Sequence, residues 1–149
     1  MKFTGRLTFL LLLQLIRPTI RRTQRAYVIL HCEPEILVVK NWLGRQRWSF
    51  PGGGIKKGEA PERTVAREVH EELGIDINPA ELKLVSTGKW QTDNLGHQYH
   101  IFYLKLPQRI DLKTRWPEVV QVDWKKPTEL NLSNSSQEVL TALRQANLL

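Results

Sequence analysis

The stretch Gly52–Ile75, with the sequence GGGIKKGEAPERTVAREVHEELGI, carries the strongest structural signal in this chain of 149 residues. Its second half has apolar residues four positions apart, and such residues share one face of an α-helix. Those residues are Val65, Val69 and Leu73. Gly74 follows directly and is well suited to end a helix, because glycine adopts the left-handed conformation at little cost. The stretch therefore predicts a glycine loop followed by a helix over residues 60–73.

Three glutamates lie on a neighbouring face of the same predicted helix. Glu68, Glu71 and Glu72 are spaced i, i+3 and i+4, which brings their carboxylates into one patch. Like charges at this spacing destabilise an isolated helix by about 0.2–0.5 kcal/mol per pair. Arg63 and Arg67 offset part of that repulsion. For a helix considered alone, a solvated acidic face is the ordinary explanation of the pattern.

The glycine loop in front of the helix favours a functional interpretation. Gly52–Gly54 and Gly58 let the backbone pass close to a ligand and present N–H and C=O groups to it. Mg²⁺ prefers oxygen ligands, commonly one or two carboxylates together with waters and substrate phosphate oxygens. Lys56 and Lys57 lie in the same loop, where they either contact a polyphosphate or are simply solvated. Loop and helix together predict a divalent-metal site that accepts a phosphate-bearing substrate.

These residues resemble the Nudix box at each of its fixed positions. The matching positions are Gly53, Glu59 and the segment Arg67–Ile75, REVHEELGI. The preceding segment 48–54 and the late segment 118–130 also resemble the family, so the resemblance covers most of the chain beyond its N-terminal arm. It implies an α/β fold of the Nudix type, an α/β/α sandwich around a mixed β-sheet, for a domain spanning residues 22–149.

The Nudix resemblance also implies a reaction. Nudix hydrolases use Mg²⁺ or Mn²⁺ to cleave the pyrophosphate bond of a nucleoside diphosphate linked to another moiety. By position, the implied metal ligands are the Gly52 carbonyl, Glu68, Glu71 and Glu72. Arg67 and Glu59 are expected to orient these ligands. The implied general base stays open among Glu68, Glu71 and, outside the box, Glu118, which is otherwise an ordinary surface acid.

Substrate recognition is less well determined than the reaction. Lys56 and Lys57 are the candidate phosphate contacts, and Trp90 is the candidate for stacking on a base, an interaction worth about 1–3 kcal/mol. The family's ADP-ribose pyrophosphatases have a proline beyond the box, and no proline lies between Pro79 and Pro107 in this chain. Motifs resembling NADH or coenzyme A pyrophosphatases are also missing.

The sequence leaves two alternatives to a small-nucleotide hydrolase. A catalytically silent Nudix-fold module that binds or senses a nucleotide would not need all three carboxylates of the acidic cluster. An RNA-processing hydrolase would use the cations of the N-terminal arm together with Arg45, Arg47, Lys56 and Lys57. The charge distribution argues against RNA, because six of the 22 lysines and arginines precede the first acid, Glu33, and the remaining 16 nearly balance the 15 acids.

Outside the glycine loop and its helix, branched and aromatic residues indicate strands. The expected strands are 25–32, 35–40, 47–50, 82–90, 98–106 and 119–124. Glu33-Pro34 predicts a hairpin between the first two, and Pro51 is expected to end the third. A late helix is expected to start near Ser135, which forms a capping-box pattern with Glu138.

The first 21 residues form an apolar and basic arm. The run Leu7–Ile16 is too short for a membrane-spanning helix and lacks a signal-peptidase site, so we expect a helix that ends before Pro18. We expect this helix to dock on the body or on a second copy of the chain, and the second case would give a homodimer. Peripheral contact with an anionic membrane is the alternative. The single cysteine, Cys32, indicates a reducing, cytoplasmic environment.

Overall fold

The computed structural model describes residues 24–41, 47–92, 95–111, 119–130, 134–145 and 147–149. The expected arm at residues 1–21, Arg45 and Glu118 lie outside these ranges. The elements in chain order are β1 (Gln24–Cys32), β2 (Glu35–Asn41), β3 (Gly52–Gly54), α2 (Pro61–Leu73), the 3-10 helix η1 (Pro79–Glu81), β4 (Lys83–Thr92), β5 (Leu95–Lys105), β6 (Val119–Lys125), the 3-10 helix η2 (Pro127–Glu129) and α3 (Asn134–Gln145).

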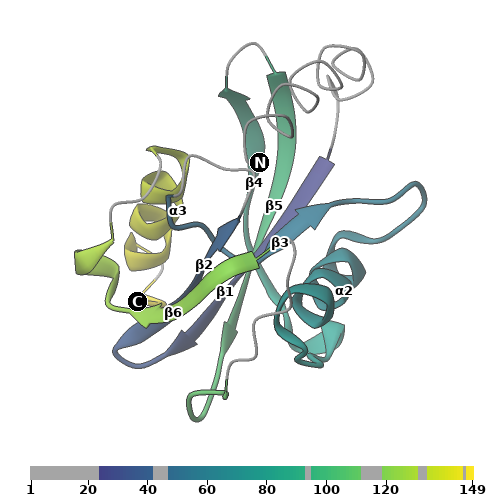
Figure 1. Ribbon diagram of the computed structural model, residues 1–149. Coiled ribbons are helices and arrows are strands. Elements are labelled where there is room, and N and C mark those ends of the chain that lie inside the picture. Colours follow the sequence, from purple (N-terminus) through teal and green to yellow (C-terminus); the bar gives the residue numbers. More distant parts are fainter. Residues whose placement is uncertain (1–23, 42–46, 93–94, 112–118, 131–133, 146) are drawn as a thin grey trace, which may run out of the picture.

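A mixed sheet separates the two helices, with α2 on one side and α3 on the other (Figure 1). The strand order is β4-β5-β1-β2-β6, and β3 pairs separately with β1. Strand β1 runs parallel to β5 and antiparallel to β2. This arrangement confirms the expected α/β/α sandwich around a mixed sheet.

Each face of the sheet has its own hydrophobic core, as the two-residue period of a strand requires. On the α2 side, the buried residues are Ala26, Val28, Leu30, Leu37, Val39, Val65, Val69, Leu73, Phe102, Leu104 and Val119. On the α3 side, they are Ile29, Ile36, Val38, Phe50, Ile101, Tyr103, Val139, Leu140 and Leu143. The apolar face predicted for the first helix is therefore its packing face.

Strand β1 changes its neighbour along its length, and this change positions the glycine loop. Near the hairpin, β1 pairs with β2, where His31 lies opposite Ile36. Towards its start, residues 25–27 pair instead with β3. The Val28 N–H donates to the Pro51 carbonyl at 3.0 Å, at the point where β3 enters the sheet. The three glycines are thereby fixed against β1 and face α2.

The prediction of a strand over residues 47–50, ended by Pro51, was wrong. Trp48 and Ser49 form bridge contacts there, with Ser49 opposite Val39, but no strand, and the strand lies after the proline. Three consecutive glycines have low strand propensity, so pairing with β1 rather than local sequence determines β3.

The other expected elements agree closely with the structure. Helix α2 follows Ala60 and ends at Gly74, whose φ of 70° is left-handed as predicted. The hairpin at Glu33-Pro34 is also confirmed. The late helix is α3, which begins at Asn134, one residue before Ser135 and therefore close to the expected start. Within the part of the chain that is described, no helix is long and apolar enough to span a membrane.

Candidate active site

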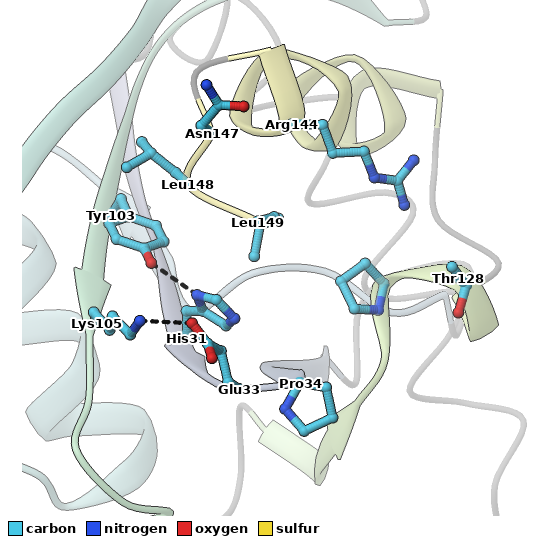
Figure 2. A pocket seen from close by; sticks show the side chains of 11 residues that line it. His31, Glu33, Pro34, Tyr103, Lys105, Thr128, Arg144, Asn147, Leu148 and Leu149 are labelled. Carbon is cyan, nitrogen blue, oxygen red and sulfur yellow. Dashed lines mark hydrogen bonds and ion pairs between the residues drawn. The ribbon is translucent and has the colours of Figure 1, made fainter.

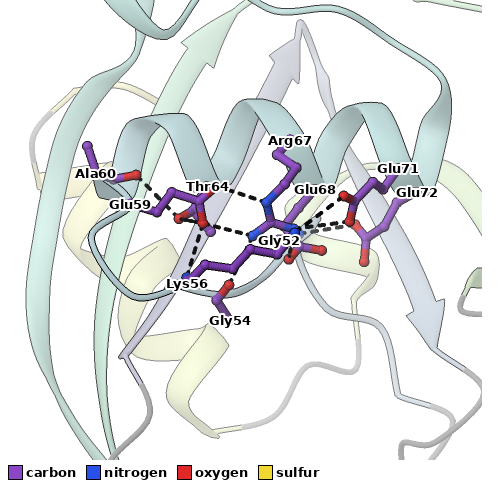
Figure 3. A network of polar contacts seen from close by, with 10 residues as sticks. All are labelled: Gly52, Gly54, Lys56, Glu59, Ala60, Thr64, Arg67, Glu68, Glu71 and Glu72. Atoms are coloured by element: carbon purple, nitrogen blue, oxygen red, sulfur yellow. Dashed lines mark hydrogen bonds and ion pairs between the residues drawn. The ribbon is translucent and has the colours of Figure 1, made fainter.

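Arg67 lies at the centre of a polar network between the glycine loop and α2 (Figure 3). Its Nε donates to Glu59 Oε1 at 2.9 Å, and its Nη2 donates to Glu59 Oε2 at 3.0 Å. This two-point contact fixes the plane of the guanidinium, because both N–H groups meet the two oxygens of one carboxylate. Glu59 therefore determines the direction in which the rest of the Arg67 head group points.

The remaining donors of Arg67 face the acidic cluster. Its Nη1 donates to Glu68 Oε1 at 2.7 Å and to Glu71 Oε2 at 3.0 Å. Its Nη2 also donates to the Gly54 carbonyl at 3.1 Å. One guanidinium thus contacts three carboxylates and a loop carbonyl. The cation offsets the like-charge repulsion that the sequence predicted for this face of the helix.

Glu59 ties the loop to the helix. Its Oε2 accepts hydrogen bonds from the Lys56 N–H at 3.1 Å and from the Thr64 hydroxyl at 2.8 Å. The hydrogen bond from Arg67 is the main cause that lowers the pKa of Glu59 to about 2, and the bonds from Lys56 and Thr64 add to it. In turn, the hydrogen bond with Glu59 raises the pKa of the Arg67 guanidinium. Both groups are therefore charged at neutral pH.

The glycine loop also contacts α2 directly at two points, through Gly52 and Gly53. Glu72 is 4% exposed, and its Oε2 accepts a hydrogen bond from the Gly52 N–H at 3.1 Å. Gly53 lies against Glu68, and a Cβ at Gly53 would be 2.5 to 2.7 Å from the Glu68 carboxyl atoms. The loop can approach the carboxylates this closely only because residue 53 has no side chain.

The structure brings together most of the residues that the sequence singled out. Glu68, Glu71, Glu72, Arg67 and Gly52 all belong to this network. Lys56 lies at its edge, with its Nζ 4.0 Å from Glu71 Oε1. Lys57 is exposed in the loop. Trp90 lies in β4, opposite His97 of β5, and its side chain is outside the described part of the structure.

Three contacts were not foreseen from the sequence, and only the first of them, between Thr64 and Glu59, belongs to the polar network. The buried Thr64 supports Glu59, and the Nζ atoms of Lys40 and Lys125 lie 4.4 and 5.1 Å from the centre of the Trp48 ring. Lys40 and Lys125 come from β2 and β6, so only the antiparallel pairing of these strands brings them near each other. Trp48 packs against the hydrophobic core on the α3 side of the sheet, so these two contacts lie on the face opposite the acidic cluster. Lys125 also forms an ion pair with Asp123 at 2.7 Å.

The acidic cluster provides a donor set that suits a hard divalent cation. Among the described residues, no three His, Cys, Asp or Glu side chains already lie in a metal-ligand arrangement. Glu68 and Glu71 are held by Arg67, and Glu72 is held by the Gly52 N–H. These are nevertheless carboxylate oxygens on one helix face, beside a glycine backbone that leaves room for them, which is the ligand chemistry of Mg²⁺ and Mn²⁺.

Comparison with known proteins identifies the same family that the sequence resembles. A family profile described as NUDIX domain matches residues 21–143. The RNA pyrophosphohydrolase of Psychromonas ingrahamii is 35% identical over 89 residues, which are 60% of this chain and 40% of that protein. The RNA pyrophosphohydrolase of Legionella pneumophila is 34% identical over 94 residues, which are 63% of this chain and 53% of that protein. The chain thus spans about half the length of these relatives.

Solved structures show the same fold at low sequence identity. A MutT NUDIX hydrolase from Burkholderia pseudomallei has a TM-score of 0.72 at 19% identity, and the match covers 82% of this chain and 98% of that chain. The NUDIX domain of Shewanella oneidensis NrtR, complexed with ADP ribose, has a TM-score of 0.68 at 15% identity, with coverage of 84% and 86%. These likenesses concern the fold alone.

Proposed function

Because this chain belongs to the NUDIX family, we propose that it is a divalent-metal-dependent pyrophosphohydrolase for a nucleoside diphosphate linked to another moiety. The observation that carries the proposal is the position of Arg67. A single guanidinium orients Glu68 and Glu71 beside a glycine loop that has room for a ligand. A fold-only binding module has no requirement for such an arrangement of charges.

The proposed metal ligands are Glu68, Glu71, Glu72 and the carbonyl of Gly52. A bound Mg²⁺ or Mn²⁺ supplies charge neutralisation at the phosphoryl oxygens and a lower pKa for a coordinated water. Binding requires Glu68 and Glu71 to share their oxygens with Arg67 or to turn away from it. Glu59 keeps Arg67 in place in either case, because its two-point contact uses different N–H groups.

Other roles, in proton transfer and in substrate binding, are proposed for side chains of the protein. We propose that Glu68, Glu71 or Glu118 accepts the proton from the attacking water, since a carboxylate is a sufficient base for a water of lowered pKa. Lys56 is exposed and adjacent to Glu71, a position from which its ammonium can reach a substrate phosphate. Lys57 and Trp90 are proposed as further contacts, to phosphate and to base respectively.

The relatives favour one substrate class for the first test. Both curated relatives described above are named RNA pyrophosphohydrolases. We therefore propose an RNA 5′-polyphosphate end as the leading candidate, although the charge distribution of the sequence predicted that nucleic acid is not a partner. Free nucleoside triphosphates and nucleotide derivatives are the second candidate class.

A substrate panel tests this proposal. The purified full chain is incubated with Mg²⁺ and a 5′-triphosphorylated RNA oligonucleotide, nucleoside triphosphates, nucleotide sugars, ADP-ribose or dinucleoside polyphosphates, and phosphate and pyrophosphate release is measured. We expect cleavage of at least one compound, lost on addition of EDTA. Preference for the RNA over all free nucleotides would support the leading candidate. No cleavage by a chain that binds Mn²⁺ would overturn the enzymatic proposal and favour a nucleotide-binding module.

We also propose that residues 1–21 lie outside the catalytic unit. The family profile begins at residue 21, which is consistent with a separate role for the arm. A homodimer formed through this arm, with peripheral membrane contact as the alternative, and a cytoplasmic location both stay predictions. Gel filtration with light scattering tests for the homodimer, and sedimentation with anionic vesicles tests for membrane contact.

A further inference from the structure

A cavity lies on the opposite face of the sheet from the acidic cluster, at the hairpin end of β1 (Figure 2). Its volume is about 590 Å³, within the range of about 300–1,000 Å³ that is typical of small-molecule sites. The lining residues are His31, Glu33, Pro34, Tyr103, Lys105, Pro127, Thr128, Arg144, Asn147, Leu148 and Leu149. None of them belongs to the Arg67 network.

The inner end of the cavity is formed by two buried side chains. His31 is 5% exposed, Tyr103 is 7% exposed, and His31 Nδ1 lies 2.7 Å from the Tyr103 hydroxyl oxygen. Burial is the main cause that lowers the pKa of His31, so its ring is neutral at neutral pH. The paired rings therefore give the cavity a polar but uncharged end. The side walls come mainly from Pro34, Pro127 and two leucines, which are apolar surfaces.

Among the described side chains that line this cavity, the charged groups leave one cation without a charged partner. The Lys105 ammonium is 2.6 Å from Glu33 Oε1, so these two charges largely cancel. Arg144 extends from α3 towards the segment that carries Thr128, as Figure 2 shows. Among the described side chains, none forms an ion pair or a hydrogen bond with the Arg144 guanidinium. The cavity thus combines apolar walls with a single available guanidinium.

We propose that this cavity binds a small planar monocarboxylate, with its carboxylate on Arg144 and its ring between the prolines and leucines. A guanidinium matches the two oxygens of a carboxylate with two parallel hydrogen bonds. Because the charges of Lys105 and Glu33 largely cancel, the Arg144 cation is matched by one negative charge, and the site favours a monoanion over a phosphate dianion. This ligand class differs from the proposed polyphosphate substrate, and the site does not depend on the proposed function.

The test uses 2-naphthoate as a probe of this class and the uncharged 2-naphthalenemethanol as its matched analogue. Isothermal titration of the full chain is expected to show one saturable site for naphthoate. Arg144→Gln should weaken the binding about tenfold, as loss of a charged hydrogen-bonded contact does. Arg63→Gln, which removes an exposed arginine of α2, should bind like the parent. The alcohol should bind about tenfold more weakly than the carboxylate.

Location and folding are checked separately. Naphthoate should shift the ring resonances of His31 and Tyr103 in the NMR spectrum, and Glu72→Gln should leave its affinity unchanged. Arg144→Gln must retain the parent's near-ultraviolet circular dichroism, and Arg144→Lys should retain part of the affinity because the charge remains. Absence of naphthoate binding, equal affinity for the alcohol, or equal affinity of a folded Arg144→Gln would each overturn the proposal.

Discussion

Because residue 53 is a glycine, the loop can lie directly against the Glu68 carboxyl group. We expect Gly53→Ala to reduce metal-dependent turnover about 100-fold, because a displacement of about 1 Å in a catalytic group costs this much. The cause is the new Cβ, which would lie 2.5 to 2.7 Å from the Glu68 carboxyl atoms. Steady-state rates at saturating Mg²⁺ provide the measurement.

The neighbouring glycine supplies the matched control for this substitution. A Cβ at Gly54 would meet nothing within 4 Å, and the Gly54 carbonyl that accepts from Arg67 is retained in an alanine variant. Gly54→Ala should therefore turn over like the parent. Equal rates for the two alanine variants would contradict the role assigned to the contact between Gly53 and Glu68.

At the residue scale, the sequence predicted which carboxylates share a face but not which atoms contact Arg67. Helical spacing alone places Glu68, Glu71 and Glu72 together, because the period of a helix is fixed. The bonds from Arg67 to Glu59 and to the Gly54 carbonyl depend on the path of the loop. That path depends on the pairing of β3 with β1, which local sequence does not encode.

At the scale of elements, the pair Glu59–Arg67 joins the loop to α2 and predicts a dependence of stability on pH. The pKa of Glu59 is lowered from 4.5 to about 2, so the folded state favours the carboxylate. Its contribution is therefore complete above about pH 4.5 and is lost as the pH falls towards about 2. Urea unfolding across this range should show a smaller loss of stability for Glu59→Gln than for the parent. Parallel pH profiles would contradict this prediction.

Elements with a strong local signal were predicted, and elements defined by distant pairing were not. Helix α2 has an apolar period and a terminating glycine, and it was predicted to within one residue. Strand β3 consists of three glycines and was missed, because only its hydrogen bonds to β1 make it a strand. Strand β5 was predicted from residue 98 but begins at Leu95, where pairing with β4 extends it.

At the scale of the whole molecule, α3 contributes to stability by covering the sheet face opposite the acidic cluster. Leu143 of this helix is fully buried against that face. Leu143→Ala should lower the free energy of unfolding by about 2–5 kcal/mol, as truncation of a buried leucine does. Leu84→Ala is the control: Leu84 is 50% exposed, and its loss should change stability by no more than about 0.5 kcal/mol. Similar urea midpoints for both variants would contradict the packing role of α3.

The N-terminal arm is predicted to affect assembly and not chemistry. Deletion of residues 1–16 should change the oligomeric state or the solubility while retaining metal-dependent turnover, since these residues precede the family match. Light scattering and the rate assay are applied to the same preparation. A truncated protein with the parent's oligomeric state and no catalysis would contradict this assignment.

If the carboxylates of α2 support metal-dependent hydrolysis, removing the charge of one of them should abolish turnover. Mg²⁺-dependent cleavage of the substrate selected by the panel is measured for the parent, Glu72→Gln and Glu62→Gln. Glu72→Gln keeps an oxygen acceptor for the Gly52 N–H but loses the charge, so it should fold and lack turnover. Glu62→Gln alters an acid in the first turn of the same helix, outside the network, and should retain turnover. Undiminished activity of Glu72→Gln would contradict the proposed role of the α2 carboxylates in metal-dependent hydrolysis.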